Sequence, residues 1–264
     1  MSEHHNDLAT VRQILDLMNE LAPPELAEKW DQIGLQTGSL DQVVTKVMLA
    51  LDATSAVIRS AASGGFTLII SHHPLIFNPL TAICTHMPEQ NLIYKLIQNS
   101  ISLIVAHTNL DAATGGVADC LLDCLWPDLP GRQTLAGYGR LIDLAEPEPL
   151  ALLPERVRRR LGSGGCRINL VHDRLVHRIA VFPGSFSEEW VALIAASGAD
   201  TVICGEIKHH LGLQLAERGV AAIDAGHDVT ERVVLQPLQK RLSARLPNVS
   251  FAVSGIIDYN GIAF

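Results

Sequence analysis

The stretch that decides the fold is Thr67-Leu68-Ile69-Ile70-Ser71-His72-His73-Pro74. Its short apolar run ends on polar side chains, which is typical of a buried parallel strand that opens into a loop. The pattern recurs twice, because apolar residues 101–105 precede His107 and apolar residues 220–223 precede His227. Ligands bind at the carboxyl edge of open α/β sheets, so we expect these polar side chains to line a binding site.

Length and composition fit an α/β protein with one large or two modest domains. The chain has 264 residues, of which 48% are hydrophobic and 5% aromatic, so aliphatic strands and Ala-rich helices are expected. No apolar run approaches the ~20 residues of a membrane span, and the N-terminus shows no signal peptide. The five cysteines form no Cys-x-x-Cys pair and are interpreted as reduced, mostly buried thiols of a cytoplasmic protein.

The charge distribution argues against general nucleic-acid affinity, because the net charge is −8. The one basic cluster, formed by Arg156 and residues 158–160, follows Pro154 at an expected helix start. This cluster is either a solvated helix face or a docking patch for phosphates.

Hydrophobic periodicity divides the chain into two α/β halves and a connector. Residues 1–128 are the N-terminal half, and residues 177–264 are the C-terminal half. Residues 129–176 are rich in Pro and Gly, and we interpret them as the connector. The expected elements of the first half are a helix over 8–21, a strand over 43–51, a helix from 54 capped by Asp52 or Thr54, a strand over 66–70, a helix over 88–97, a strand over 101–105 and a helix after 116. In the connector, short strands are expected near Leu141 and Ile168. The expected elements of the second half are a strand over 177–182, a helix over 187–196, a strand over 201–204, a helix over 209–217, a strand over 220–223 and a helix over 228–246 that Pro237 kinks or restarts.

The second half repeats the pattern of the first. Residues 67–72 parallel residues 201–206, and each stretch lies two residues after an Ala-Ser-Gly triplet. One strand later, His107-x-x-x-Asp111 parallels His227-x-x-x-Glu231. Chance matching is the alternative for the strands alone, but the recurring His and carboxylate favour a duplication. We therefore expect two pseudo-duplicated α/β half-domains with mixed sheets, facing each other across a dinuclear metal cleft.

Each pair of polar residues also has a purely structural interpretation. An extended backbone would send the rings of His72 and His73 to opposite faces, so they converge only if the chain turns before Pro74. Asp111 lies beside His107 after one helical turn, or it caps the following helix. Asp228-x-x-Glu231 fits a capping box, which leaves His227 unexplained.

Taken together, four imidazoles and two carboxylates exceed the needs of one tetrahedral zinc site. They suit two divalent ions ~3.5–4 Å apart, with carboxylates as bridges. The remaining positive field favours an anionic substrate or transition state. Such ligands suit Zn, Fe, Mn, Co and Ni alike, so they do not identify the metal. The predicted metal ligands are His72, His73, His107, Asp111, His227 and Glu231.

These motifs resemble those of the dinuclear metal-centre family known in bacteria as GTP cyclohydrolase I type 2 homologues, the Nif-three-like proteins. The likeness covers almost the whole chain. The matching motifs are Trp30-Asp31-Gln32-Ile33-Gly34-Leu35, His72-His73-Pro74, His107-Thr108-Asn109-Leu110-Asp111, Gly205-Glu206 with His209 or His210, and Gly226-His227-x-x-x-Glu231.

The resemblance implies that the six residues are ligands, with Asp111 and Glu231 as bridges, in a toroidal hexamer built as a trimer of dimers. The chain resembles the short form of the family, without the domain inserted between the halves. Two positions depart from the family pattern: Gln32 replaces the usual Asn, and residues 182–186 lack the usual Gly-rich turn.

The resemblance also implies a metal-dependent hydrolase acting on a nucleotide-like or other cyclic C–N substrate. Such an enzyme must move a proton, and Glu206, His209 and His210 are the expected catalytic residues; alternatively, the two histidines only begin a surface helix. The principal rival is a metal-trafficking protein with the same ligands. A ring around nucleic acid is disfavoured by the net charge unless Arg156 and residues 158–160 line its hole. The expected partners are a small-molecule substrate and further copies of the chain, with no membrane.

Overall fold

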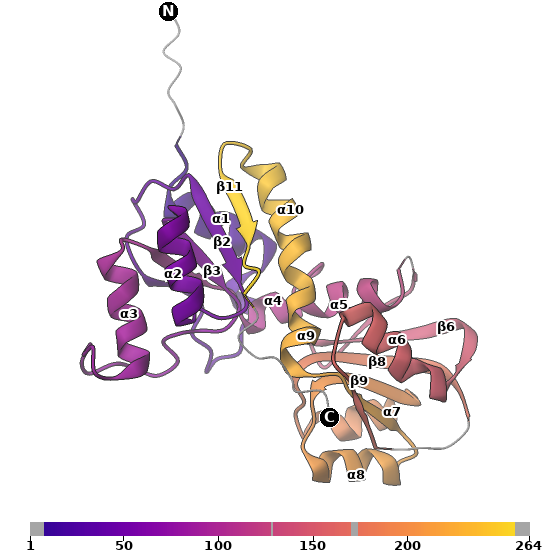
Figure 1. The fold of residues 1–264 in the computed structure, drawn as a ribbon. Coiled ribbons are helices and arrows are strands. Elements are labelled where there is room, and N and C mark those ends of the chain that lie inside the picture. Colours follow the sequence, from indigo (N-terminus) through magenta and orange to yellow (C-terminus); the bar gives the residue numbers. More distant parts are fainter. Residues whose placement is uncertain (1–7, 128, 170–173, 257–264) are drawn as a thin grey trace, which may run out of the picture. The chain divides into compact units, whose positions relative to one another are not determined.

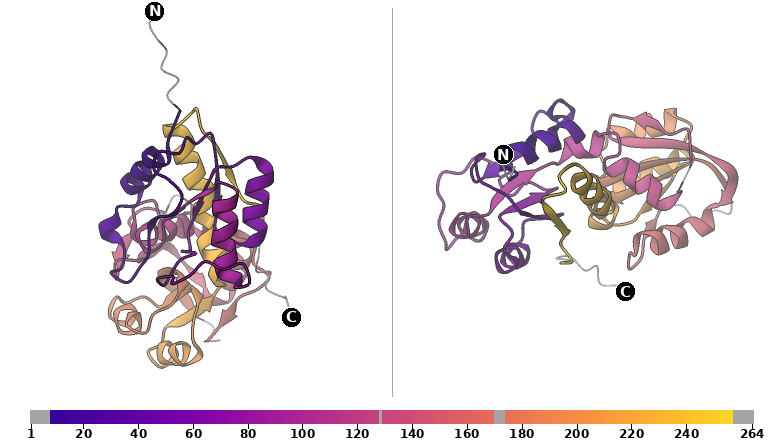
Figure 2. Two further views of the ribbon diagram at one scale, coloured as in Figure 1. Left: turned by 90° about the vertical axis from the view of Figure 1, so that its left-hand side faces the viewer. Right: turned by 90° about the horizontal axis from the view of Figure 1, so that it is seen from above.

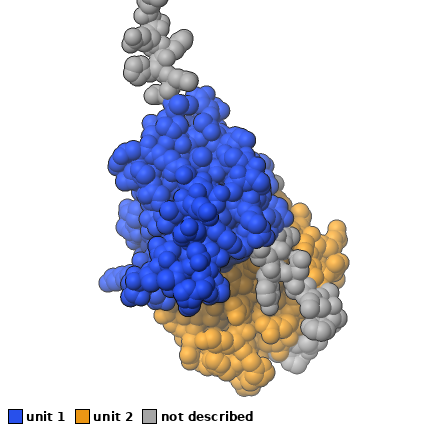
Figure 3. All heavy atoms as spheres, turned by 60° about the vertical axis from the view of Figure 1, so that its left-hand side comes forward, with its two compact units in different colours: residues 1–113, 235–258 blue, residues 114–234, 259–264 orange. Residues whose placement is uncertain are grey.

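The computed structural model describes residues 8–127, 129–169 and 174–256, which form two compact units. Of the described residues, unit 1 contains 8–113 and 235–256, and unit 2 contains 114–127, 129–169 and 174–234 (Figure 3). Each unit has its own mixed sheet, so the predicted α/β class with two mixed sheets is confirmed. In the described part of the chain, no helix combines the length and apolarity that crossing a bilayer requires.

The sheet of unit 1 is mostly parallel. Its order is β1-β4-β3-β2-β11, with β1 antiparallel to β4 and the other neighbours parallel. Ser71, the last residue of β3, pairs with Ala50 of β2 and Val105 of β4, so the loops after these strands leave the sheet at one edge. The strands are β1 (Gly34–Thr37), β2 (Lys46–Ala50), β3 (Leu68–Ser71), β4 (Ser102–Val105) and β11 (Ser250–Val253).

Helices cover both faces of this sheet. Figure 2 shows α2 and α3 side by side on one face and α1 on the other. Alternate strand residues such as Met48, Ile69 and Leu103 pack with Val57 of α2 and Leu96 of α3 in one apolar cluster. The helices are α1 (Val11–Leu21), the 3₁₀ turn η1 (Pro24–Leu26), α2 (Ser55–Gly64), α3 (Pro88–Gln98), α4 (Thr108–Ala112) and α10 (Leu235–Arg245).

The sheet of unit 2 has a parallel centre and antiparallel edges. Its order is β5-β6-β8-β9-β10-β7, in which β8, β9 and β10 are parallel (Figure 1). β5, β6 and β7 pair antiparallel to their neighbours. The strands are β5 (Gln133–Leu135), β6 (Gly139–Pro149), β7 (Arg167–Ile168), β8 (Leu175–Ser185), β9 (Thr201–Glu206) and β10 (Ala221–Asp224).

Alternation along β8 builds the two cores of unit 2. Ile179 and Val181 pack in one cluster with residues of α5 and α6, and Ala180 and Phe182 pack in another with residues of α7 and α8. Both faces of the strand are therefore apolar, as expected for a central parallel strand. The helices are α5 (Val117–Leu125), η2 (Leu150–Leu152), α6 (Leu153–Leu161), α7 (Trp190–Ala196), α8 (His209–Glu217), α9 (His227–Glu231) and η3 (Arg232–Val234).

The contacts divide the chain differently from the predicted boundaries. Residues 129–169 supply β5, β6, α6 and β7 to unit 2, so they form part of its sheet and core. The short strands expected near Leu141 and Ile168 are present as β6 and β7, but the Pro- and Gly-rich composition concealed that they join the sheet of unit 2. At the other end, the chain returns to unit 1, where α10 leads into β11 beside β2. The predicted restart at Pro237 is confirmed, because a 3₁₀ turn separates α9 from α10 and Pro237 lies in the first turn of α10.

The two units share one chain path. Unit 1 runs β2-α2-β3-α3-β4-α4, and unit 2 runs β8-α7-β9-α8-β10-α9, with three adjacent parallel strands in each. His72 and Glu206 lie at equivalent strand ends, and the five-residue helices α4 and α9 follow the third strand of each path. This topology agrees with the duplication expected from the sequence.

Candidate metal centre

His72 and His73 follow β3 directly, and the backbone turns there as the metal hypothesis required. The His72 amide donates to Ala50 O at 3.2 Å, and the His73 amide donates to Leu51 O at 2.9 Å. The two ring centroids are 5.0 Å apart, so the rings do not point to opposite faces of the sheet. His72 is buried, with 2% of its surface exposed.

His107 and Asp111 are joined by one turn of helix. His107 is the N-cap of α4, and its carbonyl accepts from the Asp111 amide at 3.0 Å. The Asn109 side chain accepts from the His107 amide at 3.0 Å, which closes the turn. Asp111 does not cap α5, whose N-cap is Gly116; its Oδ1 instead lies 3.5 Å from His72 Nε2.

These loops bring three imidazoles together. His72, His73 and His107 each offer a ring nitrogen, and the three atoms lie within 4.8 Å of one another. The His107 ring centroid is 5.2 Å from that of His72 and 5.6 Å from that of His73. Three imidazoles at this spacing are a donor set that fits Zn, Fe, Co or Ni.

Each of the three rings uses Nδ1 for a hydrogen bond within the protein. His72 Nδ1 lies 2.9 Å from Ala106 O, His73 Nδ1 lies 2.8 Å from Asp52 Oδ1, and His107 Nδ1 lies 2.8 Å from Asp31 Oδ1. These acceptors favour the tautomer with the proton on Nδ1 and the lone pair on Nε2. A carbonyl or carboxylate behind each imidazole is the usual support of histidines that bind metals. The arrangement therefore fits a divalent ion at the Nε2 atoms.

Asp31 contacts both the His107 ring and Thr108, the first residue of α4. Its Oδ2 accepts from the Thr108 amide at 3.0 Å and from the Thr108 hydroxyl at 2.5 Å. Burial alone would raise the pKa of Asp31, but the hydrogen bonds from His107 and Thr108 outweigh it and hold the pKa well below its usual range. Asp31 is thus a carboxylate that stays ionised behind His107.

Unit 2 carries its own donor pair on α9. His227 Nε2 lies 3.2 Å from Glu231 Oε1, and His227 Nδ1 lies 3.1 Å from Glu206 Oε2. The N-cap of α9 is Gly226, without a side-chain cap, so the capping box proposed for Asp228 and Glu231 does not begin this helix. Glu206 stands behind His227 as Asp31 stands behind His107.

Two glycines allow α9 to approach the strands of unit 2. A Cβ on Gly184 would lie 2.1 Å from Glu231 Oε1, and a Cβ on Gly205 would lie 2.5 Å from Thr230 Oγ1. Thr230 Oγ1 also accepts from the Gly184 amide at 3.1 Å. Gly184 also has φ +65°, a conformation that favours glycine, and it lies in the segment that departs from the family pattern.

His209 and His210 occupy the first turn of α8, where both are exposed. Within the described residues, neither side chain makes a hydrogen bond or ion pair or joins a cluster of three donors. Glu206 is thus the one predicted catalytic residue whose side chain contacts a predicted ligand. Asp31 was expected only as part of a family motif, and Asp52 only as an alternative to Thr54 for capping α2, a role that Thr54 takes. The position of Asp52 just after β2, beside β3, is the signal that could have identified its contact with His73.

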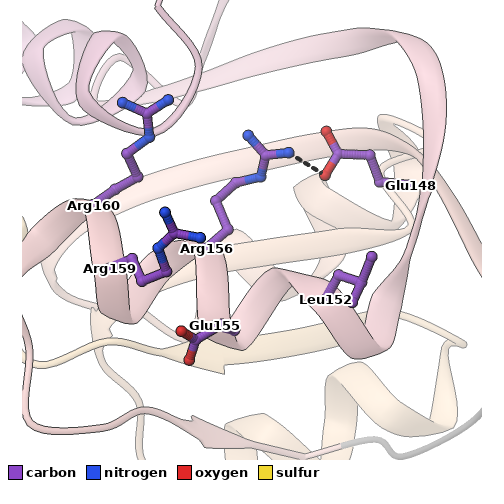
Figure 4. Close-up of a pocket in the computed structure, with 6 residues that line it drawn as sticks. All are labelled: Glu148, Leu152, Glu155, Arg156, Arg159 and Arg160. Carbon is purple, nitrogen blue, oxygen red and sulfur yellow. Dashed lines mark hydrogen bonds and ion pairs between the residues drawn. The ribbon is translucent and has the colours of Figure 1, made fainter.

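The basic cluster lies on α6 of unit 2. Glu148, Leu152, Glu155, Arg156, Arg159 and Arg160 line a pocket of about 630 Å³ (Figure 4). Arg156 Nη2 lies 2.6 Å from Glu148 Oε2, and the Arg158 guanidinium makes two 2.7 Å hydrogen bonds to Glu155. The carboxylates thus neutralise two of the four guanidinium groups, which agrees with a solvated, charged helix surface.

Comparison with known proteins identifies the class to which this fold and these motifs belong. The family model described as Duf34/NIF3 (NGG1p interacting factor 3) matches residues 9–259. The chain belongs to this family, as its motifs had indicated.

Individual relatives are similar in sequence over most of this chain. A Clostridium perfringens protein named GTP cyclohydrolase 1 type 2 homolog is 31% identical over 251 residues, which cover 92% of this chain and 95% of the relative. A Lactococcus lactis protein of the same name is 34% identical, covering 81% of this chain and 86% of the relative.

Solved structures show the same fold. A Bacillus cereus protein related to NIF3 has a TM-score of 0.90 at 24% identity, covering 97% of this chain and 99% of that one. A Staphylococcus aureus hypothetical protein has a TM-score of 0.87 at 26% identity, covering 98% and 99%.

Proposed function

We propose that this protein is a dinuclear metal-dependent hydrolase that acts on a nucleotide-like or other cyclic C–N substrate. The observation that carries the proposal is the set of three imidazoles, His72, His73 and His107, each with Nδ1 held by a carbonyl or carboxylate. Structural metal sites are usually closed by protein ligands, whereas catalytic sites leave a position for water or substrate. Three imidazoles plus one nearby carboxylate leave such positions when two ions are bound.

We also propose Asp111 and Glu231 as bridging ligands. The number of donor atoms available near Glu231 supports this proposal. His227 and Glu231 offer two ligands, and among the described residues of unit 2 no third donor joins them in a cluster. A zinc-type site needs at least three protein ligands, so this pair is expected to complete a set supplied from elsewhere in the chain.

The chemistry divides between the ions and the side chains. Bound divalent ions lower the pKa of water and stabilise negative charge on the substrate. Asp31, Asp52 and Glu206 orient the imidazoles and favour the tautomer that leaves the Nε2 lone pair free for a metal. In this proposal, Glu206, His209 or His210 passes the proton to the leaving nitrogen.

The substrate class rests on the relatives. Both the Clostridium and the Lactococcus proteins are named for similarity to a GTP cyclohydrolase, an activity that opens a ring at a C–N bond. GTP is therefore the first substrate to test, followed by other nucleotides and cyclic amides.

Metal stoichiometry combined with turnover tests the proposal. We expect two ions per chain after saturation and washing, loss of both in Asp111→Ala or Glu231→Ala, and weakening of mainly one in His73→Ala. The exposed His177, which pairs with Asp200, provides the control His177→Ala with unchanged metal content. Assays follow GTP loss and formate release, and then a wider substrate panel. One ion or none in the saturated protein contradicts the dinuclear centre.

Metal trafficking is a second candidate, and the exposure of one ligand favours it. The side chain of His227 is 37% exposed, and an accessible ligand allows exchange with an acceptor. Rapid metal transfer to a chelating acceptor, together with no turnover of any substrate at full metal occupancy, would support trafficking and exclude the hydrolase.

A further inference from the structure

Two exposed aromatic side chains lie beside the imidazole cluster of unit 1. Trp30 is 54% exposed and Phe77 is 45% exposed. The Trp30 ring centroid is 6.2 Å from that of His107 and 5.8 Å from that of Phe77. Folding usually buries aromatic rings of this size, because they contribute a large apolar surface. An exposed pair beside three metal-type donors therefore calls for a role other than packing.

Hydrogen bonds fix the backbone around both rings. Gln36 Oε1 accepts from the amides of Leu75 and Ile76 at 3.0 and 2.8 Å. Gln36 Nε2 donates to Ile76 O at 2.9 Å and to Gln32 O at 3.1 Å. One side chain thus joins the segment next to Phe77 to the segment next to Trp30.

The position of Trp30 is also linked to the metal donors. Its neighbour Asp31, whose side chain is fully buried, makes the 2.8 Å contact with His107 Nδ1. The indole plane is inclined by 73° to the His107 imidazole. The two rings are therefore nearly perpendicular to each other. Because hydrogen bonds hold the backbone next to Trp30 and Phe77, little of that backbone needs to become ordered when a ligand binds.

We propose that Trp30 and Phe77 form a stacking platform for the flat heteroaromatic ring of the substrate, next to the metal donors. A ring stacked on the indole would lie next to the imidazole cluster, where a C–N bond of the ring could react. Stacking accepts any base with a π-face, so the platform selects ring compounds over ring-free ones. The proposal rests on the proposed function for the reaction, but the binding it describes can be measured without turnover.

Calorimetric titration of the metal-loaded full chain tests the platform. The ligands are the four nucleoside monophosphates, with ribose 5-phosphate as a probe that keeps the sugar and phosphate but lacks the base. We expect at least one nucleotide to bind at least ~10-fold more tightly than ribose 5-phosphate. Trp30→Leu and Phe77→Leu should remove most of that difference, and Trp30→Phe should retain it.

The matched control is Tyr94→Leu, which removes another exposed aromatic ring of unit 1, 42% exposed on α3. This variant should bind nucleotides like the wild type, and metal content should be equal in all variants. Equal affinity for nucleotides and ribose 5-phosphate, or full nucleotide binding by Trp30→Leu, would overturn the platform. A change of oligomeric state in Trp30→Leu without loss of nucleotide binding would show that the rings form a subunit interface instead. Nucleotide binding without turnover would contradict only the hydrolase.

Discussion

Asp31 Oδ1 lies 2.8 Å from His107 Nδ1, although the two residues are 76 positions apart. The contact joins the Trp30–Leu35 signature to the histidine that caps α4. Since Asp31 also accepts two hydrogen bonds from Thr108, it fixes both the ring and the start of the helix that carries Asp111. A motif without a metal ligand thereby gains a definite role at the candidate centre.

Asp31→Asn should lower metal affinity about 10–100-fold, because the neutral amide supports the imidazole less well as a ligand. Competition with a chromophoric chelator measures the affinity, and circular dichroism checks the fold. Asp41→Asn is the control, because Asp41 makes an exposed ion pair with Arg12 at 3.2 Å. Unchanged metal affinity in Asp31→Asn would remove Asp31 from the centre.

Gly184→Ala should impair the donor pair of α9. The new Cβ would lie 2.1 Å from Glu231 Oε1, so the carboxylate or the helix must move. Gly131→Ala is matched for backbone strain, since Gly131 has φ +79° with open space around it. We expect a loss of roughly 1–2 kcal/mol in stability from strain in both variants, and reduced metal content only in Gly184→Ala. Equal metal content in the two would contradict a role for this close approach.

The strands and the histidines at their ends could be predicted from the sequence, whereas the residues that support these histidines could not. The apolar strands and the histidines that follow them could be predicted, because parallel strands buried on both faces give continuous apolar runs with polar ends. His107 and Asp111 are neighbours in the helix turn, so their spacing alone was informative.

The acceptors behind the histidines were harder to predict. Asp31 and Asp52 reach His107 and His73 from loops that have no periodic pattern, and only tertiary structure brings them together. Residues 129–169 were assigned to a connector, although short strands were expected near Leu141 and Ile168, because the pairing of β6 with β8 and of β7 with β10 is long-range and no local pattern encodes it. The return of β11 to the first sheet is a long-range pairing that no local pattern encodes.

Stability below about pH 4 should depend on a buried ion pair in unit 2. Asp119 accepts from Arg140 Nε at 2.8 Å and from the Gly115 amide at 2.7 Å. Burial raises the pKa of Asp119, but Arg140 and Gly115 outweigh it, so the pKa is lowered overall. A depressed pKa stabilises the folded state above the unfolded value of about 3.9, and this stability is lost as the pH falls through the folded pKa.

Asp119→Asn should therefore cost about 3 kcal/mol at pH 7, because it leaves the Arg140 charge buried without its partner. The difference from the wild type should shrink at about pH 3, because the carboxylate of the unfolded wild-type chain takes up a proton below about pH 3.9 and the stabilisation is then progressively lost. Urea unfolding at both pH values measures this. Asp143→Asn, which breaks the exposed pair with Arg178, should have a smaller effect. If Asp119→Asn loses the same stability at both pH values, the stabilising role of the Asp119–Arg140 ion pair would be contradicted.

The chain should assemble as a closed homo-oligomer, and the family resemblance favours a hexamer. Light scattering at micromolar concentration and neutral pH measures the mass directly. A monomer under these conditions would contradict the expectation, whereas the metal ligands proposed for each chain would still stand.

Replacing Glu206, His209 and His210 separates support of a ligand from proton transfer. Glu206 Oε2 lies 3.1 Å from His227 Nδ1, so Glu206→Gln should weaken metal binding if the carboxylate mainly orients that ring. His209 and His210 are exposed on α8 and contact no predicted ligand among the described residues, so His209→Gln and His210→Gln should leave metal content unchanged.

A proton-transfer role predicts a different result: full metal occupancy with turnover reduced by ~10²-fold or more, and a shifted limb of the pH–rate profile. We expect this result for at least one of the three variants. Metal analysis and GTP turnover on the same preparations distinguish the two roles. A variant that loses support of a ligand should show both lower metal content and lower turnover, whereas a variant that loses proton transfer should show only lower turnover. If all three variants keep normal turnover at full occupancy, the proton passes through another group and the proposed mechanism is wrong.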